Sequence, residues 1–209
     1  MKKWVLFAIS CFISFFGLAQ VNIGIQVSPS LSFSRLNETS DSAGLSSTGV
    51  GGKLQAGVFS DFLIAKSYYF STGIFFVPKR IALQDNRTRS VEEVYHLQYL
   101  QVPVMLKLFT DELALDTRIY IQTGLTGEVK INEKTDLAEQ TYLGNFRTFD
   151  ASWVIGAGLE YRIGYATTLF GGFSYRHGMI NTIAQPFQPL DGDLSLKSDF
   201  LSLDLGVKF

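Results

Sequence analysis

The sequence predicts an all-β fold, specifically a single eight-stranded antiparallel up-and-down transmembrane β-barrel, from three observations. Apolar residues alternate with polar or small residues in one segment after another, and a period of two marks a strand with different surroundings on its two sides. Long polar connections alternate with short ones, as in outer-membrane barrels. The last alternating segment ends on an aromatic residue, Phe209, where a soluble domain tends to fray.

The first residues have the pattern of an export signal. Two lysines precede an apolar run from Trp4 to Leu18, and Ala19 follows at a small-residue position. We therefore expect a cleaved signal peptide over residues 1–19 and an outer-membrane barrel domain over residues 20–209. An anchor helix and a lipoprotein signal around Cys11 are alternatives, but the run is shorter than the roughly 20 apolar residues of a membrane span.

The composition points to a membrane barrel and away from several other classes. Charged residues make up 18% of the chain, below the ~25% of soluble domains, whereas aromatic residues make up 14%. The net charge of −1 and the absence of a basic block argue against a nucleic-acid partner. Because the one cysteine, Cys11, lies in the expected signal peptide, the mature chain would form no disulfide or thiolate metal site.

Four strands are expected in the first half of the chain. From Val21 to Phe33, apolar odd positions oppose Asn, Gly, Gln and Ser at even positions. From Gly51 to Asp61, Leu, Ala and Val oppose Lys, Gln and Gly, and from Ser67 to Lys79, Tyr, Phe and Ile share one face. From Leu100 to Leu108, Leu and Val oppose Gln, Met and Lys. Pro103 lies within this fourth segment and has no N–H to donate, so we expect a bulge or a local break in pairing.

Four more strands follow in the second half. From Ile119 to Lys130, Ile, Leu and Val oppose Tyr, Gln, Gly, Thr and Glu, and from Ser152 to Arg162, Trp, Ile, Ala and Leu oppose Ser, Gly and Glu. From Thr168 to Arg176, Leu, Phe and Tyr oppose Thr, Gly and Ser. From Leu201 to Phe209, every second residue is apolar.

The connections differ in length in a regular way. The long ones run over Leu36 to Thr48, Ile81 to Val94, Asn132 to Phe149 and Ile180 to Ser198, and the short ones over Leu63 to Lys66, Thr110 to Thr117 and Gly164 to Ala166. An even strand number with long loops at one end is typical of the cell outer membrane. We expect periplasmic termini and extracellular long loops.

The polar face distinguishes an outer-membrane barrel from a soluble ligand-carrying barrel of the lipocalin type. A water-facing sheet should carry many Lys and Glu residues, but this face is mostly Gly, Ser, Thr and Gln with a few charges. Eight strands leave only enough room for side chains inside, and buried charges must be paired. The charge network expected in the lumen comprises Glu128, Lys130, Glu160, Arg162, Arg176, Asp204 and Lys208.

Four stretches resemble a known family. Lys53 to Phe62 (KLQAGVFSDF), Leu97 to Lys107 (LQYLQVPVMLK), Gly156 to Tyr161 (GAGLEY) and Leu205 to Phe209 (LGVKF) are similar to the PorT-like outer-membrane β-barrel family of Bacteroidetes. The resemblance implies a barrel over nearly the whole mature chain and no catalytic motif. The family's namesake is linked to protein secretion across the outer membrane.

Candidate chemistry is sparse. Only His96 and His177 could serve a lipid-modifying enzyme, and the sequence pairs neither with a nucleophile. Asp191 and Asp193 lack the ligand series of a calcium loop. The inward charges could instead line an ion path. The long loops contain four aromatic residues that could contact a partner or pack on each other, namely Tyr142, Phe146, Phe149 and Phe187.

We therefore expect a non-enzymatic barrel with no catalytic, cofactor or metal site and a structural or accessory role in the envelope. A narrow pore or ligand-passing barrel and a lipid-modifying enzyme remain alternatives. Expected partners are outer-membrane lipid, the barrel-assembly machinery, and envelope or secretion proteins that contact the loops. Leu205, Val207 and Phe209 are expected to form the assembly signal that this machinery reads.

Overall fold

A computed structural model of the chain describes residues 21–38, 45–47, 51–85, 93–135, 143–181, 183–186 and 194–209. The expected signal peptide, with Cys11, lies outside these ranges. Eight long strands form the wall: β1 (Val21–Glu38), β3 (Gly51–Ala65), β4 (Tyr68–Asp85), β5 (Glu93–Phe109), β6 (Thr117–Thr135), β8 (Phe149–Arg162), β9 (Thr168–Gly178) and β11 (Leu194–Lys208). No helix in the described ranges is long and apolar enough to cross a membrane.

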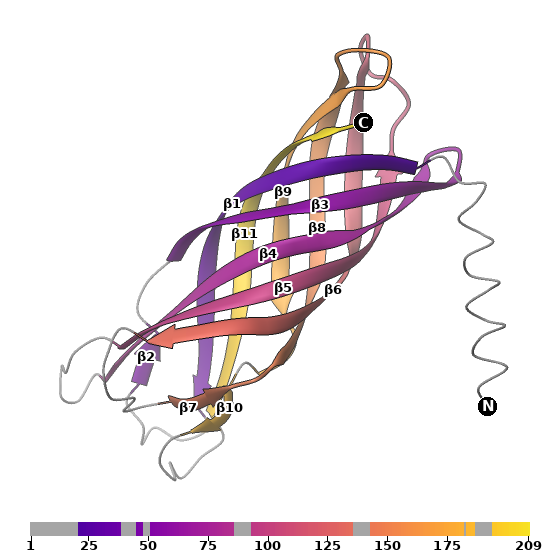
Figure 1. The fold of residues 1–209 in the computed structure, drawn as a ribbon. Coiled ribbons are helices and arrows are strands. Elements are labelled where there is room, and N and C mark those ends of the chain that lie inside the picture. The colour runs from indigo at the N-terminus through magenta and orange to yellow at the C-terminus, as the bar shows by residue number, and fades with distance from the viewer. Residues whose placement is uncertain are drawn as a thin grey trace, which may run out of the picture.

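Each wall strand pairs antiparallel with the next, and β11 pairs with β1 to close the barrel (Figure 1). The closure extends to the last residue. The Phe209 N–H donates to Ile23 O at 2.7 Å, and the Ile23 N–H donates to Phe209 O at 3.1 Å. The predicted eight-stranded up-and-down barrel is therefore confirmed, with all of the expected strands in the expected order.

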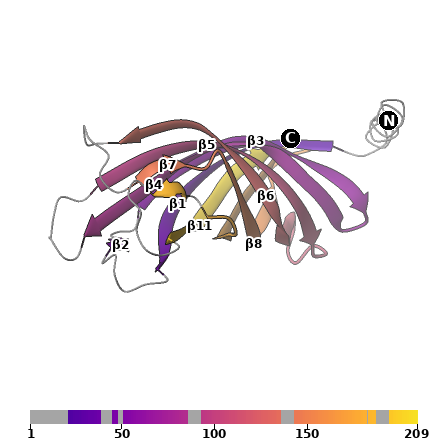
Figure 2. The ribbon, with the colours of Figure 1, turned by 90° about the horizontal axis from the view of Figure 1, so that it is seen from below.

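Three short strands lie at the end of the barrel opposite the C-terminus: β2 (Leu45–Ser47), β7 (Leu143–Phe146) and β10 (Ile183–Pro186) (Figures 1 and 2). β2 adds to the extension of β4, and β7 and β10 form a separate two-stranded ribbon. The sequence prediction treated these residues as loops. It also ended the wall too early, because β4 and β5 stay paired as far as Leu83 and Glu93.

Pro103 interrupts the sheet on one side only. The β4–β5 pairing passes from Thr72–Val104 to Phe75–Gln101 without a shift in register, so the pairs in between are missing. The expected local break is confirmed, while on the β6 side Pro103 stays in register with its neighbours. The register of the β5–β6 pairing shifts elsewhere, between Gln98 and Tyr99, where Ile131 is the extra residue on β6.

The two faces of the wall have opposite character, as the alternation predicts. On β1, the outward side chain of Ile25 is 54% exposed, whereas the inward Ser28 is 2% exposed. The same alternation of exposed apolar and buried residues continues around the barrel. An apolar outer surface around a partly polar interior suits a lipid surrounding and confirms which face is the inside.

Candidate functional site

The interior near the long-loop end contains a buried ion cluster, here called the loop-end cluster, of Lys79, Glu128 and Asp150. Lys79 Nζ lies 2.5 Å from Glu128 Oε2 and 2.7 Å from Asp150 Oδ2, and all three side chains are at most 3% exposed. The ammonium group also lies 4.4 Å from the centre of the Tyr99 ring. These residues come from β4, β5, β6 and β8, so the cluster fastens strands that are not all neighbours.

A second cluster, the turn-end cluster, lies near the short turns and contains Asp61, Lys107, Arg118, Glu160 and Lys208. Lys107 Nζ lies 3.0 Å from Asp61 Oδ1, and Lys208 Nζ lies 2.6 Å from Glu160 Oε1 and 3.6 Å from Asp61 Oδ2. Arg118 reaches Glu160 at 3.3 Å. The five charges therefore form one connected network across the barrel.

Aromatic rings fill the space around the turn-end cluster. Lys107 Nζ lies 4.5 Å from the centre of the Phe59 ring, and Lys208 Nζ lies 5.1 Å from that of Phe109. Phe59 packs edge to face on Phe170 at 5.4 Å, and Phe109 lies 5.9 Å from Tyr120. Because these rings surround paired ions, they close the turn end of the interior.

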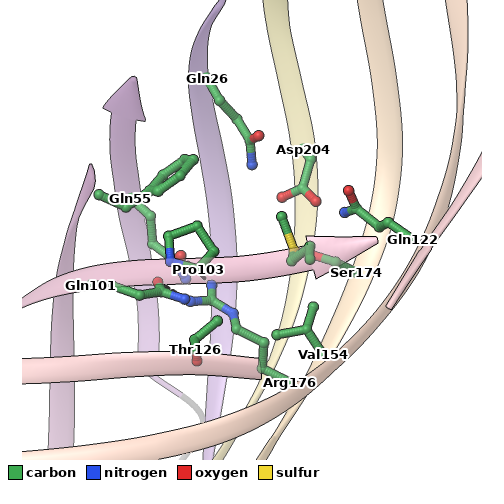
Figure 3. A pocket seen from close by; sticks show the side chains of 12 residues that line it. Gln26, Gln55, Gln101, Pro103, Gln122, Thr126, Val154, Ser174, Arg176 and Asp204 are labelled. Carbon is green, nitrogen blue, oxygen red and sulfur yellow. Dashed lines mark hydrogen bonds between the residues drawn. The ribbon is translucent and has the colours of Figure 1, made fainter. Parts of the chain in front are cut away.

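The middle layer of the interior is held by Arg176 (Figure 3). Its guanidinium donates to Gln101 Oε1 at 2.7 Å, to Ser202 Oγ at 3.1 Å and to Gln55 Oε1. Glutamine carbonyls thus replace a carboxylate as its bonding partners. A cavity of about 40 Å³ adjoins these groups, which is room for only a few water molecules.

Formal charge balances across these three layers. Asp204 in the middle layer accepts a hydrogen bond from Ser28 Oγ at 2.8 Å. With Arg176 and Asp204, the two clusters contain five cations and five carboxylates. Since an unpaired buried ion costs several kcal/mol, this balance lets a narrow barrel keep so many ions inside.

The seven residues predicted to form the lumen charge network differ in how deeply they are buried. Glu128, Glu160, Arg176, Asp204 and Lys208 are buried inside the barrel. Lys130 is half-buried, lies 2.6 Å from Glu133 and donates to Phe146 O at 2.7 Å. Arg162 lies outside the packed interior, at the end of β8, where its side chain is 47% exposed and its Nη1 lies 4.0 Å from Asp116 Oδ1.

Five members of the two clusters were absent from that prediction: Asp61, Lys79, Lys107, Arg118 and Asp150. Each has the inward phase of its strand. Phase alone could have identified Asp61, Lys79 and Lys107 within the expected strands, and extending the alternation by one or two residues would have found Arg118 and Asp150. Lys79, for example, follows Phe75 and Val77 on the inward face of β4.

An outward-facing group at the long-loop end, here called the rim cluster, contains Arg35, Tyr175, His177 and Asp199. Arg35 Nη2 donates to Asp199 Oδ1 at 2.9 Å, and the Tyr175 hydroxyl donates to Asp199 Oδ2 at 3.0 Å. The backbone N–H of Gly178 donates to Asp199 Oδ1 at 3.1 Å. The carboxylate is therefore occupied by three donors.

The two histidines differ in their contacts. His177 Nδ1 lies 3.6 Å from Asp199 Oδ1 and 3.4 Å from the Tyr175 hydroxyl. His96 Nδ1 lies 3.4 Å from Lys53 Nζ. His177 thus has a carboxylate nearby, as a general base would need, but its contacts within the described residues include no serine hydroxyl.

The structure describes some, but not all, of the aromatic and acidic loop residues that the sequence singled out. Phe146 is buried and packs on Tyr95 at 5.0 Å, whereas Phe149 is 67% exposed. Outside the described ranges lie Tyr142, Phe187, Asp191 and Asp193. No group of three or more His, Cys, Asp or Glu side chains within the described ranges could hold a metal ion.

The expected assembly signal lies on the outer surface of the last strand. Leu205 and Phe209 point outward and are exposed, and Val207 is half-buried. These residues share the apolar phase of the last strand, as the alternation in the sequence indicates.

Comparison with known proteins supports the architecture. The family profile described as outer membrane protein β-barrel domain matches residues 18–184. The fold resembles OprG from Pseudomonas aeruginosa, with a TM-score of 0.63 at 12% identity over 91% of this chain and 96% of OprG. It also resembles Neisserial surface protein A (NspA), with a TM-score of 0.54 at 11% identity over 91% of this chain and 97% of NspA.

The outer membrane protease OmpT from Escherichia coli has a TM-score of 0.51 at 8% identity over 90% of this chain and 96% of OmpT. At these identities the likeness concerns the fold alone. No curated protein matches the chain in sequence.

Proposed function

The chain belongs to the family of outer membrane protein β-barrel domains, and we propose that it is a non-enzymatic barrel with a structural or accessory role in the cell envelope. Its termini face the periplasm and its long loops face the outside of the cell. The four stretches that resemble the PorT-like barrels of Bacteroidetes favour an association with secretion or transport. Partner proteins then bind through the loops, since rigid barrels present variable loops as contact surfaces.

The observation that carries this proposal is the packed interior. Two ion clusters and their aromatic neighbours fill the two ends, and the middle layer contains a cavity of about 40 Å³. A pore or a ligand-passing barrel needs a continuous path, which these side chains oppose. The rigid wall therefore serves as a support for what its ends contact.

The proposal is tested by chemical cross-linking in intact cells followed by purification from native membranes. We expect a defined envelope or secretion protein to co-purify with the wild-type chain. It should be lost when the connection over residues 136–142 is replaced by a Gly/Ser segment of equal length. A matched replacement in the short turn at residues 164–166 should keep the partner. Identical recovery from both replacements would contradict binding through the long loops.

The lipid-modifying alternative has one observation in its favour, the approach of His177 to Asp199. That carboxylate already accepts hydrogen bonds from Arg35, Tyr175 and Gly178, so a structural role accounts for the contact. Purified wild type and His177→Ala are compared for acyl release from phospholipid vesicles. We expect no turnover by either protein, and turnover that His177→Ala abolishes would establish the enzyme instead.

A further inference from the structure

The outer wall contains an apolar hollow of about 530 Å³ across four neighbouring strands, β3, β1, β11 and β9. Its outward-facing lining is formed by Pro29, Leu31, Leu54, Phe173, Leu201 and Leu203. This volume is within the range of about 300–1,000 Å³ that small-molecule sites occupy. Such a depression interrupts the otherwise continuous outer surface of the wall, so we looked for the residues that produce it.

Gly52 and Pro29 are two of the residues that line the hollow. At Gly52, a Cβ atom would meet nothing within 4 Å. Pro29 lacks an N–H, and the β1–β11 pairing passes from Val27–Leu205 to Ser30–Ser202 without pairs in between. The larger side chains of Leu54 and Phe173 stand at the borders. The absence of a side chain at Gly52 therefore leaves space in the wall, and the apolar side chains around it line the hollow.

The rim cluster lies on the same strands, farther toward the long-loop end. Leu31, Phe33 and Arg35 follow one another on the outward face of β1, and Leu201 and Asp199 do so on β11. Arg35 lies four positions beyond Leu31, which is about 13 Å at about 3.3 Å per residue. Polar groups thus lie about 13 Å from the apolar hollow along the strands. An amphipathic ligand has a comparable separation between its polar and apolar parts.

The rim carries donors that its own contacts do not use. Lys197 is the cross-strand partner of Arg35, is half-buried, and has no hydrogen-bond or ion-pair partner among the described residues. Arg35 is held by Asp199 through Nε and Nη2, and its side chain is 41% exposed. A guanidinium has five N–H donors, so an oriented Arg35 can still bind an anion beside Lys197. Phosphate oxygens are well suited to such a pair.

We propose that this surface binds one phosphate-bearing lipid of the leaflet at the long-loop end. An acyl chain lies in the hollow, and the headgroup phosphate contacts Arg35 and Lys197. Asp199 positions Arg35 through the hydrogen bond from Nη2 and the ion-pair contact with Nε, while the Tyr175 hydroxyl and the Gly178 N–H hold the carboxylate in place. Exposed Trp153, cross-strand partner of His177, borders the site at headgroup level, where aromatic residues collect.

The test measures lipid retention by the folded full-length barrel in detergent, using native mass spectrometry. The probes are dimyristoyl phosphatidic acid, dimyristoyl glycerol and inorganic phosphate. The headgroup variants are Lys197→Gln and the double variant Arg35→Gln with Lys197→Gln. The hollow is filled by Gly52→Leu. Matched controls are the double variant Lys66→Gln with Arg162→Gln at the short-turn end, and Gly127→Leu, an exposed glycine on β6 with equally open space.

We expect wild type to retain phosphatidic acid at least about tenfold better than dimyristoyl glycerol. Lys197→Gln should weaken retention about fivefold and the double variant about tenfold or more, since each basic group near anionic lipid contributes a similar factor. Gly52→Leu should weaken retention by a comparable factor, and both controls should match wild type. Unboiled gel mobility confirms that every variant is folded.

Three results would overturn the proposal. Equal retention of phosphatidic acid by the headgroup variants and wild type would show that Arg35 and Lys197 do not bind the headgroup phosphate. Unchanged retention of phosphatidic acid by Gly52→Leu would show that the hollow does not bind an acyl chain. Full displacement of phosphatidic acid by inorganic phosphate at matched concentration would identify an anion site without lipid specificity.

Discussion

Lys79 Nζ lies 2.5 Å from Glu128 Oε2 inside the barrel, and neither side chain is more than 1% exposed. The two residues belong to β4 and β6, which are separated by β5. An ion pair that spans an intervening strand couples the positions of three strands. Burying the two charges costs desolvation free energy, and the attraction between them offsets this cost only while both partners and their other contacts remain.

We predict that Lys79→Met destabilises the barrel by about 3–5 kcal/mol, because it leaves Glu128 and Asp150 buried without their cation. Glu128→Gln should cost less, since the Lys79–Asp150 pair at 2.7 Å survives. The measurement is urea unfolding in lipid vesicles, followed by tryptophan fluorescence. Equal midpoints for Lys79→Met and wild type would show that the cluster adds nothing to stability.

The contact between Tyr120 and two glycines gives a second prediction. A Cβ atom at Gly158 would lie 2.5 Å from both Tyr120 Oη and Gly171 O, and one at Gly172 would lie 2.6 Å from Tyr120 Oη. Gly158→Val should therefore prevent the barrel from closing, because the nearest backbone atom cannot move aside. The expected result is loss of the faster-migrating unboiled band in a detergent gel.

The control for this change is Gly127→Val, at an outward-facing position of β6 where a Cβ atom would meet nothing within 4 Å. It should keep the unboiled band. If Gly158→Val and Gly127→Val fold equally well, the packing of Tyr120 is not a constraint on closure.

Removal of Phe209 gives a third prediction. Its backbone exchanges two hydrogen bonds with Ile23, at 2.7 and 3.1 Å, where the last strand meets the first. Deleting Phe209 removes both hydrogen bonds and the aromatic residue of the expected assembly signal. We expect a lower amount of protein in the outer-membrane fraction, measured by immunoblot after membrane separation.

The conservative variant Phe209→Tyr retains the backbone and the ring and should insert normally. Normal membrane levels of the shortened chain would refute a role of Phe209 in assembly.

The wall of the barrel was predictable because each wall strand has lipid on one side and packed side chains on the other. That difference imposes a period of two which a short sequence window reveals, as in the alternation from Leu201 to Phe209. The strand ends were less predictable. Beyond Lys79, β4 continues to Asp85 by pairing with β5 and β2, which depends on residues distant in sequence.

The interior was predictable only as a list of inward positions. Phase identifies Glu128 and Lys208 as inward, but the partner of each is set by the stagger between strands. Lys79 meets Glu128 across β5, and Lys208 meets Asp61 and Glu160 on separate strands. Phase alone does not separate Arg162 from the buried positions, since an inward position beyond the packed region faces solvent.

The most direct test of the account is the conductance of the purified barrel in a planar lipid bilayer. A conducting outer-membrane porin, reconstituted in the same bilayer, is the positive control for the detection of current steps. Because paired ions and rings fill both ends of the wild-type interior, we predict no discrete current steps from wild type under voltages that the bilayer tolerates. Reproducible single-channel steps from the folded wild-type protein would contradict the packed, accessory barrel and establish a pore.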